Sequence, residues 1–417
     1  MTRMAEPAAD GHRWPSGLWF PILAGGLIMG MALGIRHVQG LFLLPVSMDR
    51  GWSRDTFALA MAVQNLTWGI AQPFAGMVAD RFGSTKVIIA GLLLYAIGLL
   101  GMMQATTVPL FVLSAGICIG IAQAGTTFGV VYGAINRLMP PQRRSWALGL
   151  ASAIGGLGQF ALVPMTQNLI GTWGWMNALL ILAVVMPFLL LLVFPLRDRA
   201  TTAQPVGESV SPMPMSAAIA EAFSHRGFWL LNIGFLACGF QLTFAATYLP
   251  SYLTDNGMSA SDGVTALALI ALMNVIGSYL FGFWGGRMSR KHLLAAIYLA
   301  RSIAIALFIT VPLSTPSVFV FSVVLGFLFL GPVPLTNGLT AQIFGVRYIA
   351  TLFGFLFFSH QLGSFFGVWA GGYVFEATGS YQAGWIISIL LGVLAAIVHL
   401  PINDRPIVRG PLTVAAP

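Results

Sequence analysis

The sequence reads Gly76-Met-Val-Ala-Asp80-Arg81-Phe-Gly83-Ser-Thr-Lys86 between two long apolar runs, and a weaker copy, Gly282-Phe-Trp-Gly-Gly286-Arg287-Met-Ser-Arg290-Lys291, stands in the second half of the chain. A shift of 206 residues places Gly76 on Gly282 and Arg81 on Arg287. Shifts of 205 or 206 residues also pair glycines and prolines in several other apolar runs. One match means little in a chain with 48 glycines, but a constant shift across several runs indicates two parallel repeats.

The apolar runs around these two segments indicate a membrane protein. The chain has 417 residues, of which 57% are apolar and only 8% charged, whereas about a quarter of the residues of a soluble domain are charged. Twelve runs are long enough to cross a bilayer core, which takes about 20 helical residues. We therefore predict an all-α membrane protein with twelve transmembrane helices in two six-helix parallel repeats. The polar stretch 196–226 divides residues 1–195, an N-terminal bundle, from residues 227–417, a C-terminal bundle.

The basic charge of the chain reports its orientation in the membrane. The net charge is +8, and most of the 20 Lys and Arg residues fall in loops on one side when alternate loops are assigned to opposite sides. The positive-inside rule makes that side, both termini and the 196–226 linker cytoplasmic. The excess of basic residues therefore gives no reason to expect a nucleic-acid partner. The loops are too short to indicate an obligate protein partner.

Sequence signals of enzymes are missing from the chain. It has no phosphate-binding Gly-Lys-Ser/Thr loop, no cluster of metal ligands, and no Ser/His/Asp group that avoids lipid-embedded acids. We expect no catalysis, no cofactor and no bound metal.

The segment 76–86 resembles the signature loop of the major facilitator superfamily, and the copy at 282–291 stands where that family carries a second one. The resemblance implies a secondary transporter that works by alternating access. It also implies a conformational latch, formed here by Gly76, Asp80, Arg81, Gly83, Lys86 and Arg287. The alternative for Arg81 and Lys86 is a positively charged topology anchor.

The first predicted helix indicates a subgroup within this superfamily. The segment from Gly34 to Pro45, followed by Gly51-Trp52-Ser53-Arg54, resembles bacterial homologues of the monocarboxylate transporters and of the oxalate/formate antiporter. That group moves small organic anions across the plasma membrane, which in a bacterium is the inner membrane. However, the charged positions of helix eight in its animal members correspond to Asn274 and Ser278 here. The anion-binding group must then lie elsewhere.

Only two charged residues, Arg36 and Arg301, lie within the apolar runs. A charge at bilayer depth is costly unless it faces protein or water, so each arginine is a candidate functional residue. Arg36 lies in helix one, which lines the central cavity of this fold, and a guanidinium matches a carboxylate bidentately. Arg301 lies about 15 Å into helix nine, which is usually peripheral. For each arginine a structural role is the alternative.

Several polar residues near these positions complete the predicted site. Gln39 follows Arg36 by one helical turn, Gln241 is its equivalent in the second repeat, and Asn274 takes the relatives' charged position. We predict that these three bind substrate together with Arg36 and Arg301. His37 and His360 are candidates for proton coupling, because no Asp or Glu remains within the apolar runs.

The sequence thus predicts a transporter of small organic anions, most simply of monocarboxylates, by proton symport or anion exchange. The alternative is a multidrug or other solute exporter of the same superfamily. That class would carry an embedded acid and a glycine-proline motif in helix five, and this chain has neither.

Overall fold

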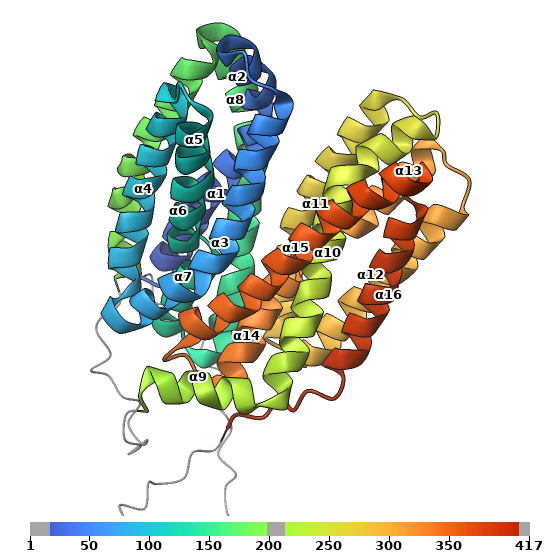
Figure 1. Ribbon diagram of the computed structural model, residues 1–417. Helices are drawn as coiled ribbons and strands as arrows, with labels where there is room; N and C mark the ends of the chain where they lie inside the picture. Colours follow the sequence, from blue (N-terminus) through green and yellow to red (C-terminus); the bar gives the residue numbers. More distant parts are fainter. Residues whose placement is uncertain (1–16, 198–212, 408–417) are drawn as a thin grey trace, which may run out of the picture.

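The computed structural model describes residues 17–197 and 213–407, and these residues fold as a bundle of long helices (Figure 1). The first half of the chain contains α1 (Trp19–Val38), η1 (Gln39–Phe42), α2 (Leu43–Arg50), α3 (Arg54–Phe82), α4 (Ser84–Gln104), α5 (Val108–Phe111), η2 (Val112–Cys118), α6 (Ile119–Thr126), α7 (Phe128–Leu138), η3 (Pro141–Arg143), α8 (Arg144–Phe188), η4 (Leu189–Leu192) and η5 (Phe194–Leu196). The second half contains α9 (Met215–Ser224), α10 (Arg226–Asp255), α11 (Ala260–Gly285), α12 (Arg290–Thr310), α13 (Thr315–Phe327), α14 (Pro332–Phe344), α15 (Ile349–Thr378) and α16 (Gln382–His399).

The helices account for the predicted membrane crossings. Within the described ranges, ten helical segments are long and apolar enough to span a bilayer. One of them, residues 141–192, contains two helices that meet at Gly174, where φ is +79°. The helix α3 has 29 residues but is more polar than the others, since it carries charged residues at both ends. The predicted all-α membrane fold is confirmed. Most of the linker predicted at 196–226 lies outside the described residues, and α9, which was not predicted, occupies its end.

The two repeats share an irregular fourth helix. In the first half, the helix breaks at Thr127, between α6 and α7, and in the second half it breaks between Phe327 and Pro332, where α13 gives way to α14. A shift of 205 residues places Thr127 on Pro332. Broken helices are tolerated at membrane depth only where protein or water satisfies the freed backbone groups. These breaks therefore mark interior positions in both halves.

Glycines let the two halves approach each other at two equivalent crossings. Where α3 meets α15, a side chain at Gly76 would collide with the Ala350 carbonyl. Where α8 meets α11, a Cβ on Gly149 would lie 2.5 Å from the Gly282 Cα. Gly76 and Gly282 are repeat equivalents, so the same feature of each repeat is used twice. Small residues at such crossings allow close backbone packing between membrane helices.

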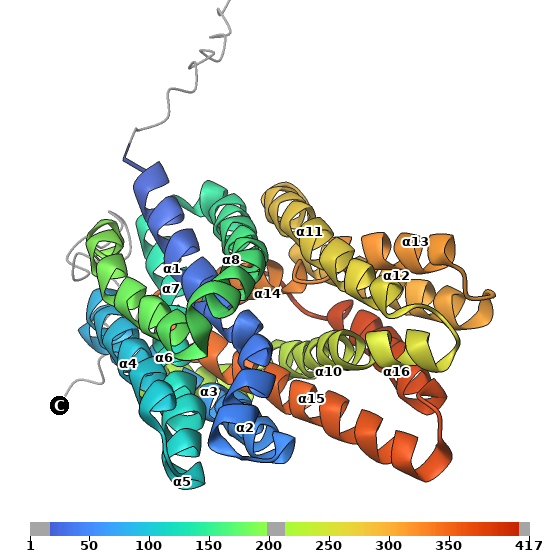
Figure 2. The same cartoon turned by 90° about the horizontal axis from the view of Figure 1, so that it is seen from above.

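These crossings lie toward one end of the molecule, where the junctions α3–α4, α7–α8, α11–α12 and α14–α15 gather. We call it the linker end because α9 lies across it (Figure 1). The Tyr348 hydroxyl donates to the Met213 carbonyl at 2.8 Å, and the rings of Phe223 and Phe355 lie 5.1 Å apart. The ribbons of the two halves diverge from this end toward the opposite one, where α2 and α13 lie (Figures 1 and 2).

Candidate functional site

Arg36 lies about 26 Å along α1 from Trp19, near the middle of the first membrane-spanning segment. Its guanidinium donates from Nη2 to the Asn65 Oδ1 on α3 and lies 5.1 Å from the centre of the Trp68 ring. The side chain is half-buried, and its Nε has no hydrogen-bond partner among the described residues. No described carboxylate forms an ion pair with it. Arg36 therefore keeps an uncompensated positive charge at membrane depth.

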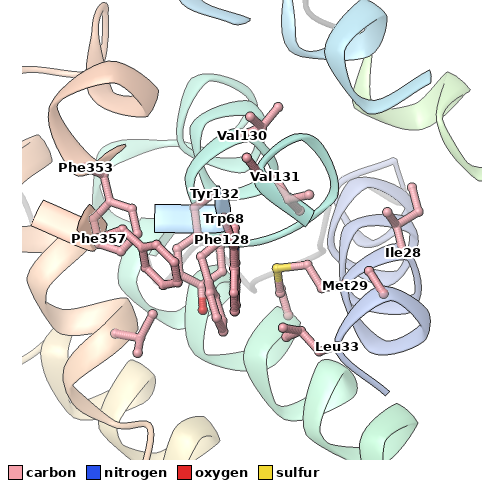
Figure 3. Close-up of a cluster of buried hydrophobic side chains, with 14 of the residues drawn as sticks. Ile28, Met29, Leu33, Trp68, Phe128, Val130, Val131, Tyr132, Phe353 and Phe357 are labelled. Atoms are coloured by element: carbon pink, nitrogen blue, oxygen red, sulfur yellow. The ribbon is translucent and has the colours of Figure 1, made fainter. Parts of the chain in front are cut away.

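The Trp68 ring beside Arg36 belongs to a group of packed aromatic rings from both halves, which we call the aromatic wall (Figure 3). The Trp68 ring lies 4.8 Å from that of Phe357 on α15, and Phe128 lies 5.9 Å from Phe357. Tyr132 lies 6.3 Å from Phe353. The figure shows these rings pointing toward one another, with Met29 of α1 beside them. These rings therefore form a packed apolar contact between the two halves.

A polar chain connects Arg36 to the second half. Asn65, which accepts from Arg36, also offers its backbone carbonyl to the Gln361 amide of α15 at 3.3 Å. The Gln361 Oε1 lies 3.3 Å from the Nδ1 of His360, and the other ring nitrogen of His360 has no described partner. His360 is buried and stacks on Phe357 at 5.5 Å. The structure therefore brings Arg36 and His360 to the same interface between the halves.

The other predicted residues of helix one are placed differently from each other. His37 is exposed. Gln39 is 1% exposed, and neither polar atom of its side chain has a hydrogen-bond partner among the described residues. Leaving a buried amide without a hydrogen-bond partner is costly. Gln39, three residues after Arg36, therefore has a donor and an acceptor that a ligand could use.

Arg301 has a different environment from that of Arg36. It is fully buried, and its guanidinium donates to the carbonyls of Leu328 and Phe329 at 2.6 and 2.9 Å. These carbonyls end α13 at the break in the tenth span, where a helix C-terminus carries partial negative charge. Arg301 also donates to the Gln241 Oε1 at 3.0 Å. Both terminal nitrogens of Arg301 are thus engaged by protein groups, while its Nε, like that of Arg36, has no partner among the described residues.

Gln241 and Asn274 belong to the same surroundings. The Gln241 amide donates to the Ser388 carbonyl at 2.8 Å, so both ends of this side chain are occupied. The Asn274 Oδ1 accepts from the Leu330 backbone N–H at 3.1 Å, within the break between α13 and α14. Arg301, Gln241 and Asn274 therefore hold the broken helix, and this geometry favours the structural alternative for all three.

The repeat alignment explains why the two arginines differ. Shifting by 206 residues places Tyr95 of α4 on Arg301, and shifting by 205 places Arg36 on Gln241. In the first half, the Tyr95 hydroxyl donates to the Ala32 carbonyl at 2.8 Å and lies 3.5 Å from the Gln123 amide. Tyr95 thus joins the first, third and fourth spans, as Arg301 joins the seventh, ninth and tenth. The first half thus joins its first, third and fourth spans through the neutral side chain of Tyr95, so Arg36 is not needed for this junction.

The predicted latch is centred on Asp80. Its carboxylate accepts from the Arg137 Nη1 at 2.7 Å, from the Thr351 backbone N–H at 2.7 Å and from the Thr351 hydroxyl at 2.8 Å. Thr351 lies in the first turn of α15, so a carboxylate of the first half caps a helix of the second half, where negative charge is favourable. Gly76 permits this approach one turn earlier in α3.

Three basic residues of the predicted latch lie outside this contact. Arg81, Lys86 and Arg287 are exposed, and Arg81 and Arg287 lie over the neighbouring rings of Phe82 and Phe283. Gly83 has φ +95° and makes the sharp turn from α3 to α4. The exposure of Arg81 and Lys86 favours the anchor alternative for these two residues.

The site and the latch predicted from the sequence did not include four residues that the structure brings to them. Arg137 and Thr351 complete the latch, and Asn65 and Trp68 surround Arg36. The sequence did hint at Arg137, because it is a basic residue just after an apolar run on the same predicted side of the membrane as Asp80. Trp68 lay three residues beyond Asn65 on the same helix, a spacing that puts both on one face.

The chain was compared with known proteins. The model of the Major Facilitator Superfamily matches residues 22–367 and 266–414. Monocarboxylate transporter 13 of Rattus norvegicus is 24% identical over 96% of this chain and 92% of its own length. The oxalate:formate antiporter of Oxalobacter formigenes is 23% identical over 93% of each chain. The solved structure of the transporter FucP in its outward conformation covers 91% of this chain and 97% of its own, with TM-score 0.72 and 17% identity.

Proposed function

Because this chain belongs to the Major Facilitator Superfamily of solute transporters, we propose that it is a secondary active transporter of small organic anions whose carboxylate is held by Arg36. The observation that carries the proposal is the uncompensated guanidinium of Arg36, half-buried at the interface between the halves. A charge in such a place needs a counter-charge for much of its working cycle. A carboxylate supplies that charge and pairs with the guanidinium fork in two parallel hydrogen bonds.

The surroundings of Arg36 suit a small, partly apolar anion. The Trp68 ring lies against the guanidinium, and such stacking holds the planar group in one orientation. The aromatic wall of Trp68, Phe128 and Phe357 offers apolar surface to the rest of the substrate. One arginine favours a single dominant carboxylate, hence a monocarboxylate. The printed names of the two relatives, a monocarboxylate transporter and an oxalate:formate antiporter, agree with this class.

The linker end faces the cytoplasm in this proposal. Basic residues at the helix junctions of this end include Arg81, Lys86, Arg137, Arg144, Arg287, Arg290 and Lys291. With the Asp80 contact made and the aromatic wall packed, the route from Arg36 to the cytoplasm is closed. The described conformation would therefore receive substrate from outside, and both termini would lie inside.

Coupling to protons is assigned to His360. It is a buried histidine at the interface, and its Nδ1 is reached from Arg36 through Asn65 and Gln361, while its Nε2 has no partner among the described residues. When an anion neutralises Arg36, protonation of His360 becomes less costly, because two positive charges no longer face each other. That linkage would make substrate binding and protonation cooperative.

Uptake into proteoliposomes tests the proposal. The panel contains labelled lactate-like monocarboxylates, dicarboxylates and a neutral sugar, with and without a pH gradient, for the wild type, Arg36→Gln and Arg301→Gln. We expect saturable carboxylate uptake that Arg36→Gln abolishes. Arg301→Gln should reduce the amount of folded protein. The folded fraction of this variant should prefer the same substrates as the wild type.

The outcomes separate the parts of the proposal. Uptake that Arg36→Gln leaves intact refutes the binding role of Arg36. Stimulation by an inward proton gradient that His360→Gln removes supports symport through His360, whereas gradient-independent exchange refutes it. No uptake of any carboxylate by folded wild-type protein refutes the substrate class.

A further inference from the structure

We propose that the groove between α3 and α4 is a binding site for one anionic glycerophospholipid of the cytoplasmic leaflet, with Lys86 at its phosphate. The groove encloses about 710 Å³ and is completed by α6. Its lining includes Ile70, Phe74, Phe82, Leu94 and Ile121, with Lys86 as its charged member. The inference concerns the outer surface of the bundle and is independent of the transported substrate.

The apolar part of the groove has the dimensions of a lipid chain. It runs about 18 Å along α3 from Phe82 to Ile70 and about 12 Å along α4 from Lys86 to Leu94. Half of a bilayer core is about 15 Å thick. Ile70 and Phe74 are 48% and 60% exposed, so the groove opens sideways to the membrane. An acyl chain entering from one leaflet would fill it.

The charge at the mouth of the groove selects the headgroup. Lys86 and Arg81 are exposed at the linker end, at the level of the phosphates. The carboxylate of Asp80, which precedes Arg81 in the sequence, is 0% exposed and pairs with Arg137. Among the described residues that line the groove, Lys86 is the charged one, and basic groups placed beside apolar grooves between spans recognise anionic lipids.

A second groove provides an internal comparison. It lies between α12 and α13, encloses about 510 Å³, and its lining includes Ala304, Phe308 and Val320 but no charged residue. Lipid chains can enter both grooves, but only the first offers a reason to prefer an anionic headgroup.

Native mass spectrometry of the purified protein in a neutral detergent tests the proposal. Palmitoyl-oleoyl phosphatidylglycerol and phosphatidylcholine are titrated separately against wild type, Lys86→Gln, Arg287→Gln and Ala90→Phe. Ala90 lines the groove on α4, so phenylalanine there fills it. Arg287, the repeat equivalent of Arg81, is exposed away from the groove and controls for general basic surface.

We expect wild type and Arg287→Gln to retain one phosphatidylglycerol with at least tenfold preference over phosphatidylcholine. Lys86→Gln should weaken phosphatidylglycerol binding at least fivefold, and Ala90→Phe should remove that one tight adduct. Thermal melting checks that each variant is folded. Equal retention of both lipids by wild type, or equal losses in Lys86→Gln and Arg287→Gln, would overturn the proposal.

Discussion

Replacing Gly149 by alanine should open the linker end without unfolding the protein. A Cβ at this position would lie 2.5 Å from the Gly282 Cα and 2.8 Å from the Ser278 carbonyl oxygen. Ordinary carbon contacts are no closer than about 3.4 Å, so α8 and α11 must separate by about 1 Å. Overpacking of this kind costs about 1–3 kcal/mol. If the protein works by alternating access, as we propose, α8 and α11 separate when the linker end opens, so the free-energy cost of the added methyl group falls on the closed state alone.

The magnitude of the shift follows from this asymmetry. Each 1.36 kcal/mol changes an equilibrium constant about tenfold, so the ratio of open to closed states should rise about 5-fold to 150-fold. Spin labels on cysteines at Gln142 and Met288, with the two native cysteines replaced, report this ratio as a distance distribution. Both positions are exposed and stand on opposite sides of the α8–α11 crossing.

Two other glycines serve as controls. At Gly363, a Cβ would collide with the Leu236 carbonyl, but α15 and α10 belong to the same half. Gly363→Ala should therefore lower the melting temperature without favouring the long distance. Gly171, with nothing within 4 Å of its Cβ position, should tolerate alanine. An unchanged distance distribution in Gly149→Ala, with normal uptake, would refute the reasoning.

Three further predictions follow from single contacts. Asp80→Asn should weaken two charged hydrogen bonds to Thr351 by about 1 kcal/mol each, and the same spin labels should record about a 30-fold gain of the open state; an unaltered distribution would contradict this. Arg301→Gln should destabilise the fold by about 2 kcal/mol, because buried carbonyls lose their donor, and a melting curve identical to wild type would contradict it. Arg36→Lys should raise the KM for uptake about tenfold through loss of the bidentate fork, and an unchanged KM would argue against carboxylate pairing.

The fold was predictable because its signals are properties of the chain itself. Apolar length fixes which segments cross the bilayer, and the constant shift between Gly76 and Gly282 fixes the repeat. The breaks at Thr127 and before Pro332 were not predictable in this way. They depend on partners from other helices that satisfy the freed backbone groups, and α9 depends on packing against Phe355.

The candidate site shows where residue identity stops being informative. Arg36 and Arg301 carry the same charge and lie at comparable depth, yet one meets a single amide and an indole ring, and the other meets helix-end carbonyls. Backbone carbonyls belong to every residue, so the sequence gives no mark of those that bind an arginine. The repeat alignment supplies the missing distinction, since Tyr95 does in the first half what Arg301 does in the second. Tyr95 and Arg301 therefore make equivalent junctions in the two halves, which favours a structural role for Arg301. Arg36, whose equivalent Gln241 has partners at both ends in the second half, has only Asn65 and the Trp68 ring beside it among the described residues, and this difference is the reason for proposing that it binds the substrate.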